Sequence, residues 1–184
     1  MQDHGTANGQ NPIDPKRRAL DPPSSAVTLL TNELLKQAVQ ASRLNDRKRV
    51  ILPLHKSADA LLHRMFNVMQ PGTYIPPHRH TAPPKDESIV VVRGALCFIT
   101  FDEAGKVEQM TDIAAGTSIF GVDVCAGVYH TFFILEPDTA MFEVKPGPFS
   151  PVTDKDFPTW APREGDAGAA DYMAQLRQMR ESQR

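Results

Sequence analysis

Between Leu61 and Lys145 the chain alternates short apolar runs with turn residues, a pattern that predicts β-strands. Runs of β-branched and aromatic residues with a period near two are interrupted every eight to twelve residues by glycine, proline or acidic turns. The predicted strands are Arg64–Gln70, Thr73–Pro77, Ser88–Arg93, Ala95–Phe101, Lys106–Asp112, Ser118–Val122, Val128–Leu135 and Ala140–Lys145. Short strands at this spacing are typical of an antiparallel sandwich or jelly roll.

Two helices are predicted on either side of the strands. Thr31 can cap a helix that runs to about Leu44, and its apolar residues recur at helical spacing. A second helix is expected over Ala167–Arg180, with Tyr172 and Leu176 on its apolar face. One small barrel need not cover both apolar stripes, so we expect a homodimer.

These patterns divide the chain into three parts. Residues 1–25 contain four prolines and almost no large apolar side chains, which predicts a flexible tail. Residues 26–150 are expected to form one β-domain with an N-terminal helix. Residues 151–184 read as a proline-rich extension followed by the C-terminal helix.

The composition of the chain argues against several classes of binding partner. The 184 residues carry 20 basic and 22 acidic side chains, a net charge of −2, which argues against binding to nucleic acid or to an anionic membrane surface. No apolar run approaches the roughly 20 residues that span a bilayer. The first thirty residues show no signal-peptide pattern, so we expect a cytoplasmic protein. In that compartment Cys97 and Cys125 would stay thiols.

The segment 72–80 carries the most informative chemistry. Alternate residues of an extended strand face the same way, so His78 and His80 project from one face. Glu87 begins the next predicted strand. The turn at Gly94 brings that strand alongside, which places a carboxylate beside the two imidazoles.

His130 shares a strand face with Val128, Phe132 and Ile134, and therefore points into an apolar interior. It is either a core histidine or a third nitrogen ligand. Three neutral imidazoles and one carboxylate suit a single divalent transition metal such as Zn, Fe, Mn or Ni, and affinity alone does not select among them. Such a set leaves positions for water, dioxygen or a chelating substrate.

The spacing of these residues resembles the two sequence motifs of the cupin superfamily. The corresponding stretches are Gly72-x5-His78-x-His80-x6-Glu87-x6-Gly94 and Gly127-x2-His130. The resemblance implies an all-β protein with flanking helices, built on a cupin-type double-stranded β-helix (jelly-roll) barrel. It also implies that His78, His80, Glu87 and His130 are metal ligands. Six residues separate His80 from Glu87 where three or four are usual, so Glu87 either ligates the metal or orients a bound water.

A narrower resemblance, covering about residues 31–151, is to the WbuC family of cupin-fold metalloproteins. It rests on the segments Pro71–His80, Phe101–Gly105, Leu135–Asp138 and Glu143–Phe149. Members of that family are associated with polysaccharide gene clusters, particularly those for O-antigen. The resemblance therefore implies a small-molecule ligand that is a sugar or a sugar nucleotide.

Three functions compete on these grounds. The first is a metal-dependent enzyme of polysaccharide biosynthesis that acts on a carbohydrate or sugar nucleotide by Lewis-acid isomerase, epimerase or lyase chemistry. The second is an iron-dependent dioxygenase, which needs adjacent open positions on the metal. The third is a non-catalytic, metal-dependent protein that binds a sugar or another small molecule.

Four residues near the expected ligands are candidates for substrate binding. Strand parity places Tyr74 on the same side as the two histidines of segment 72–80, and places Phe98 and Phe132 on the inner face. The aromatic rings either form a wall for a sugar ring or are ordinary core. Lys85, in the loop before Glu87, either steers an anion or is a solvated loop lysine.

Overall fold

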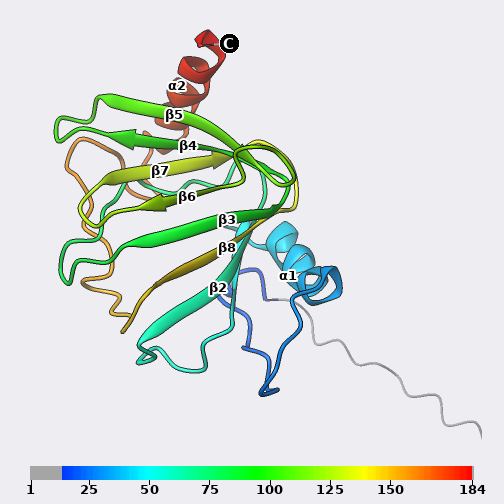
Figure 1. The fold of residues 1–184 in the computed structure, drawn as a ribbon. Coiled ribbons are helices and arrows are strands. Elements are labelled where there is room, and N and C mark those ends of the chain that lie inside the picture. Colours follow the sequence, from blue (N-terminus) through cyan, green and yellow to red (C-terminus); the bar gives the residue numbers. More distant parts are fainter. Residues whose placement is uncertain (1–13, 184) are drawn as a thin grey trace, which may run out of the picture.

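The computed structural model describes residues 14–183, which form two antiparallel sheets with a helix beside each (Figure 1). The elements in chain order are α1 (Asn32–Leu44), β1 (Arg49–Pro53), β2 (Leu62–Met69), β3 (Glu87–Arg93), β4 (Ala95–Phe101), β5 (Val107–Ala114), β6 (Gly121–Val124), β7 (Tyr129–Ile134), β8 (Thr139–Pro146) and α2 (Ala169–Ser182). Within residues 14–183, neither helix is long and apolar enough to cross a membrane.

The strand order is that of a jelly roll. One sheet has the order β1-β2-β8-β3-β6 and the other β5-β4-β7. An antiparallel bridge between His78 and His130 sets the segment that precedes β3 against the free side of β7. With this segment counted as a strand, each sheet contributes four strands to an eight-stranded jelly roll, and β1 extends the first sheet. The predicted cupin-type jelly-roll fold is confirmed.

The strand predicted at Ser118–Val122 lies a few residues later, as β6, and two larger differences from the sequence prediction concern the architecture. The strand expected at Thr73–Pro77 is absent as a regular strand, because Pro76 and Pro77 have no amide hydrogen with which to form a ladder. The chain pairs only from His78 onward. The edge strand β1 was not predicted, and it pairs antiparallel with β2 over its full length.

The core has three parts, separated by the two sheets. Inward side chains of both sheets, among them Ile89, Phe98, Phe132 and Met141, fill the barrel. A second cluster lies between α1 and the outer face of the first sheet. A third lies between α2 and the outer face of the second sheet. Each face of each sheet is therefore used for packing, which explains why β4 and β7 are buried almost throughout.

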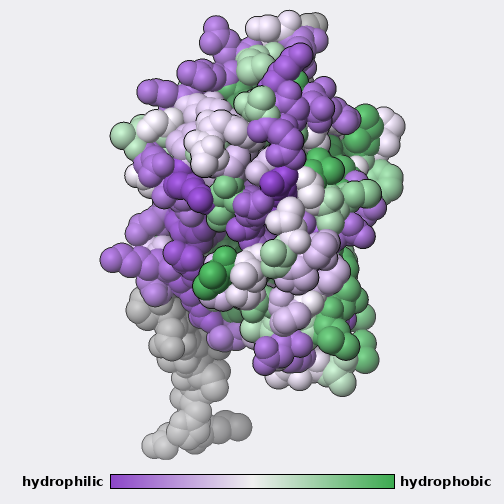
Figure 2. Space-filling view, turned by 90° about the vertical axis from the view of Figure 1, so that its left-hand side faces the viewer, coloured by the Kyte–Doolittle hydropathy of each residue, from purple (hydrophilic) through white to green (hydrophobic). Residues whose placement is uncertain are grey.

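Both helices bury most of their apolar stripes within the chain, although Met179 of α2 is exposed. In α1, which Thr31 caps as predicted, Leu35 and Val39 are buried, and in α2 Met173 and Leu176 are buried. The stripes therefore no longer argue for a second subunit, and the homodimer stays a prediction. Figure 2 shows a largely hydrophilic face with hydrophobic residues gathered along one edge.

The N-terminal prediction needs correction from residue 14 onward, while residues 1–13 lie outside the described part. Leu20 is buried in the cluster beneath α1. Its amide donates to the carbonyl of Ile51 at 2.8 Å, and the Ile51 amide donates to Arg18 at 3.1 Å. One apolar side chain and a few hydrogen bonds to β1 thus hold residues 14–21 as an arm rather than as part of a flexible tail.

Candidate metal centre

The four residues that resemble cupin ligands meet inside one end of the barrel. His78 and His80 come from the segment before β3, Glu87 is the first residue of β3, and His130 lies in β7. One ligand atom from each residue can be chosen so that all four lie within 4.8 Å of one another. All four side chains are buried, with residue exposures of 1–3%.

The long gap between His80 and Glu87 does not remove the carboxylate from this cluster. A bridge between Thr81 and Pro84 folds the intervening residues into a compact loop. Glu87 then begins β3 with the same inward parity as Ile89. Its Oε2 lies 3.2 Å from His130 Nε2 and 3.8 Å from His80 Nε2.

All three imidazoles are oriented by backbone carbonyls. The Nδ1 atom of His78 lies 2.9 Å from the carbonyl oxygen of Pro76, and that of His130 lies 3.0 Å from that of Val128. The Nδ1 atom of His80 donates to the carbonyl of Asp154. Because a carbonyl oxygen can only accept, each Nδ1 carries the hydrogen, which in a neutral ring leaves a lone pair on Nε2.

The inner atoms of the cluster therefore repel one another unless a cation lies between them. Three Nε2 lone pairs and the Glu87 carboxylate are all acceptors, and His80 Nε2 is buried without a hydrogen-bond partner among the described residues. For His78 a second ring proton is disfavoured, because burial, together with the nearby charge of Lys155, holds its pKa well below the usual range. The donor set fits a divalent cation.

The distances between the ligand atoms are also close to those found around a bound metal ion. Two ligands of one first-row ion lie at most about 4.2 Å apart, which is twice a metal–nitrogen bond of about 2.1 Å. In this structure the four ligand atoms lie within 4.8 Å of one another. A movement of about half an ångström, within the range of small side-chain rotations, would bring the four ligand atoms into a common coordination shell.

A layer of buried charges surrounds Glu87. The Nζ of Lys145 lies 3.6 Å from Glu87, 3.0 Å from Glu143 and 3.5 Å from Asp154. Burial would raise the pKa of Glu87, but the charge of Lys145 holds it well below its usual range. Glu87 is therefore an anion at neutral pH.

Glu143 is a further buried carboxylate that pairs with Lys145. Its Oε2 accepts from Asn67 Nδ2 at 2.6 Å. Burial, followed by the charge of Glu87, raises the pKa of Glu143 to about 7. The sequence places Glu143 and Lys145 on one face of the last strand without assigning either to the site, and both lie on the same face as the inward Met141.

The C-terminal extension closes this end of the barrel. Arg79 and Asp156 form an antiparallel bridge, with backbone hydrogen bonds of 2.9 and 2.8 Å. Their side chains form an outward ion pair at 2.8 Å. Lys155 and Phe157 alternate with Asp156 and so face inward, where Phe157 packs beside His78. We call residues 154–157 the strap.

The structure corrects two of the four predicted substrate residues. Tyr74 packs on the outer cluster beneath α2, and its hydroxyl donates to the carbonyl of Pro162 at 2.7 Å. The proline pair shifts strand parity, so that Ile75 rather than Tyr74 faces the barrel interior. Lys85 is neither exposed nor free to steer an anion, because it is buried and donates to Pro148 and Asp154.

Phe98 and Phe132 lie on the inner face, as strand parity predicts, and belong to the barrel core. Phe98 also stacks on the ring of His130, with centroids 5.8 Å apart and an interplanar angle of 20°. It lines a pocket of about 400 Å³ between β5 and β6. Phe98 therefore separates this pocket from the histidine cluster. Whether Phe98 or Phe132 touches a substrate stays a prediction.

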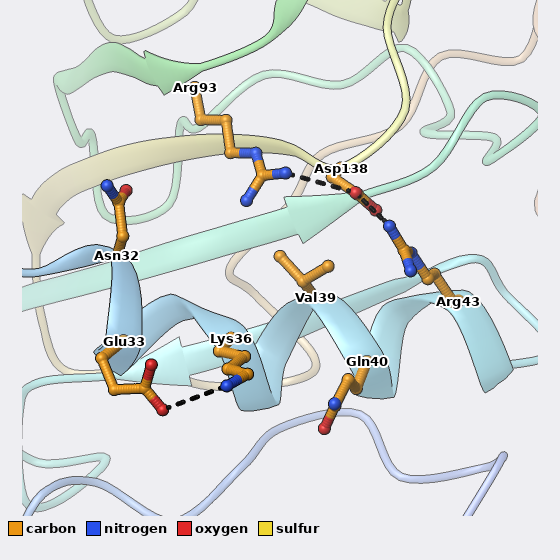
Figure 3. Close-up of a pocket in the computed structure, with 8 residues that line it drawn as sticks. All are labelled: Asn32, Glu33, Lys36, Val39, Gln40, Arg43, Arg93 and Asp138. Atoms are coloured by element: carbon orange, nitrogen blue, oxygen red, sulfur yellow. Dashed lines mark hydrogen bonds and ion pairs between the residues drawn. The ribbon is translucent and has the colours of Figure 1, made fainter.

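A second pocket of about 400 Å³ lies on the far side of the first sheet, over α1 (Figure 3). Its floor is an ion-pair network in which Asp138 accepts from Arg43 and Arg93. In Figure 3 the remaining lining residues are polar except for Val39. The pocket contains none of the four predicted ligands.

Comparison with known proteins gives only partial matches. A family model described as a domain of unknown function (DUF6016) matches residues 30–113, less than half of the chain. No curated protein matches the sequence. Among solved structures, an oxalate decarboxylase variant from Bacillus subtilis is 21% identical over 50% of this chain and 23% of its own, with a TM-score of 0.42.

A second similar structure is the capsular polysaccharide assembling protein CapF from Staphylococcus aureus. It is 20% identical over 59% of this chain and 29% of its own, with a TM-score of 0.46. The chain thus spans about a quarter of the length of these proteins. The jelly-roll assignment rests on the strand order of this protein rather than on these matches.

Proposed function

We propose that this protein binds one divalent transition metal through His78, His80, Glu87 and His130. The observation that carries the proposal is the buried set of four acceptors, with His80 Nε2 lacking any donor among the described residues. Three imidazoles and a carboxylate accept Zn, Fe, Mn or Ni. When bound, the metal would supply Lewis acidity toward an oxygen of a small-molecule ligand.

The surrounding residues prepare the ligands for this role. Backbone carbonyls fix each imidazole with Nε2 toward the centre, which is the outer-shell arrangement that holds metal-binding histidines in one tautomer. Lys145 holds the Glu87 carboxylate ionised from the opposite side. Glu87 is proposed as a direct ligand rather than an orienter of water, because its oxygen lies within the imidazole cluster.

We further propose that the protein is an enzyme acting on a carbohydrate or sugar nucleotide of polysaccharide biosynthesis, by isomerase, epimerase or lyase chemistry. The support is the resemblance of segments 71–80 and 143–149 to the WbuC family. A pocket near the centre, on the other side of Phe98 from His130, offers a small molecule a place.

A non-catalytic binding protein is the second candidate. It is favoured by the burial of all four ligands under the strap, since an enzyme must admit its substrate to the metal. Turnover against a panel of sugar nucleotides separates these candidates. Anaerobic purification followed by metal analysis would identify a ferrous centre and so test the dioxygenase alternative.

The metal site is tested by metal content and affinity of purified variants. His80→Ala and His130→Ala should each lose metal occupancy while keeping the far-ultraviolet circular dichroism of the wild type, because the barrel core is built from aliphatic and aromatic residues. Glu87→Gln should weaken affinity by more than the roughly 10- to 100-fold typical of outer-shell residues. His55→Ala, outside the cluster, is the matched control. Full occupancy in both histidine variants would refute the site.

A further inference from the structure

Lys155 reaches into the candidate metal centre from the strap. Its Nζ lies 3.1 Å from His78 Nε2, the atom proposed to ligate the metal. The bridge between Arg79 and Asp156 fixes the parity that turns Lys155 inward. The side chain nevertheless keeps 35% of its surface exposed, whereas the four ligands are almost fully buried.

An ammonium group and a metal ion cannot use the same lone pair of His78. Binding of the metal therefore requires Nζ of Lys155 to leave His78 Nε2. The exposed third of the side chain provides room for that movement without unfolding of the strap, which Asp154 and Asp156 hold at either side of Lys155. After the movement, Lys155 would stand at the rim of the centre on the solvent side.

The charged side chains around the centre determine the net charge that Lys155 would experience at the rim. Three lysines and three carboxylates form the buried layer and the strap contact: Lys85, Lys145, Lys155, Glu87, Glu143 and Asp154. Their formal charges cancel. Addition of a divalent ion leaves a net charge of about +2 in a region largely removed from water, which is costly unless an anion accompanies the ion.

We propose that Lys155 binds an anionic oxygen, from a carboxylate or a phosphate group, of the small molecule held at the metal. The inference rests on the proposed metal site and deepens it by naming the chemical class of the ligand. A metal ion and a lysine ammonium on the same side of an anion neutralise it jointly, and the charge-assisted hydrogen bond adds orientation. Lys155 is thus a positioning and specificity-determining residue.

The test uses the full chain loaded with Co²⁺, whose visible spectrum reports both metal binding and ligand exchange. Inorganic phosphate and acetate are titrated at constant ionic strength into the wild type, Lys155→Met, Lys155→Arg and Lys106→Met. Lys106 is exposed in the turn before β5, so its variant is matched for charge but remote from the site. Glucose serves as the neutral probe. The tighter of the two anions indicates whether the site favours phosphate or carboxylate.

Lys155→Met should bind Co²⁺ at least as tightly as the wild type, because a competitor for His78 is gone. Its affinity for the better anion should fall by about tenfold or more, the usual effect of losing one hydrogen bond to a charged group. Lys155→Arg should recover most of that loss, and Lys106→Met should match the wild type.

Three results would overturn the proposal, and they are distinguishable. Co²⁺ binding with less than a twofold change in anion affinity in Lys155→Met would refute the role of Lys155 while leaving the metal site intact. Failure of the wild type to bind Co²⁺ would refute the metal site itself and this inference with it. Equal binding of glucose and the anions by the wild type would also refute the anionic ligand.

Discussion

Two aspartates of the strap, one buried and one exposed, test how burial changes the contribution of an ion pair to the free energy of unfolding. Asp154 and Asp156 both accept from basic side chains, but their surroundings differ. The Asp154 side chain is 5% exposed and pairs with Lys85 at 3.2 Å and Lys145 at 3.5 Å. The Asp156 side chain is 43% exposed and pairs with Arg79 at 2.8 Å. The exposed pair has the shorter contact.

Isosteric replacement by asparagine removes one charge in either case. In Asp154→Asn, Lys85 loses its only charged partner among the ion pairs of the described residues while 2% exposed, and it keeps just neutral acceptors, the carbonyl of Pro148 and the new amide oxygen. Breaking a buried pair in this way costs about 3–5 kcal/mol, and we expect the lower end because Lys145 retains Glu143. Asp156→Asn should cost about 1 kcal/mol or less, because water screens the exposed pair.

Urea denaturation in the presence of a chelator measures both variants without a contribution from bound metal. With a denaturant slope of about 3 kcal/mol per molar, the midpoint should fall by about 1 M for Asp154→Asn and by about 0.3 M or less for Asp156→Asn. The pH should lie above the pKa of about 7 of Glu143, so that Glu143 is ionised and still pairs with Lys145. Equal shifts for the two variants, or a larger shift for Asp156→Asn, would refute the assignment of Asp154 as a buried anchor.

Three further outcomes are expected. Leu20→Ala should lower the free energy of unfolding by about 2 kcal/mol, because this side chain is buried in the arm; an unchanged urea midpoint would restore the flexible-tail prediction. Gly94→Ala should destabilise the protein severely, since the residue has φ +74° and an added Cβ would lie 2.4 Å from Thr139 Oγ1; a wild-type melting temperature would contradict the turn. Zn²⁺ at about 100 times its dissociation constant should stabilise the wild type by about 2.7 kcal/mol, reversibly on chelation, and His80→Ala should not respond.

The sequence by itself determined the architecture and the residues of the candidate centre. Helical spacing located α1, with Thr31 as its cap, and period-two alternation located β4 at its observed bounds. Both signals are local, because a residue's face in a helix or strand depends only on its position in the repeat. The same parity turned His130 inward beside Phe132, and the position of Glu87 at the start of the next strand brought its carboxylate into the set.

Only the tertiary structure decided the layer around those ligands. Tyr74 left the interior because two prolines interrupted the strand whose parity had placed it there. Lys85 became a buried partner of Asp154, a residue 69 positions away, and Lys155 reached His78 across 77 positions. No repeat in the sequence encodes such contacts. They arise when the chain folds back on itself, because a buried charge must find a partner wherever the fold provides one.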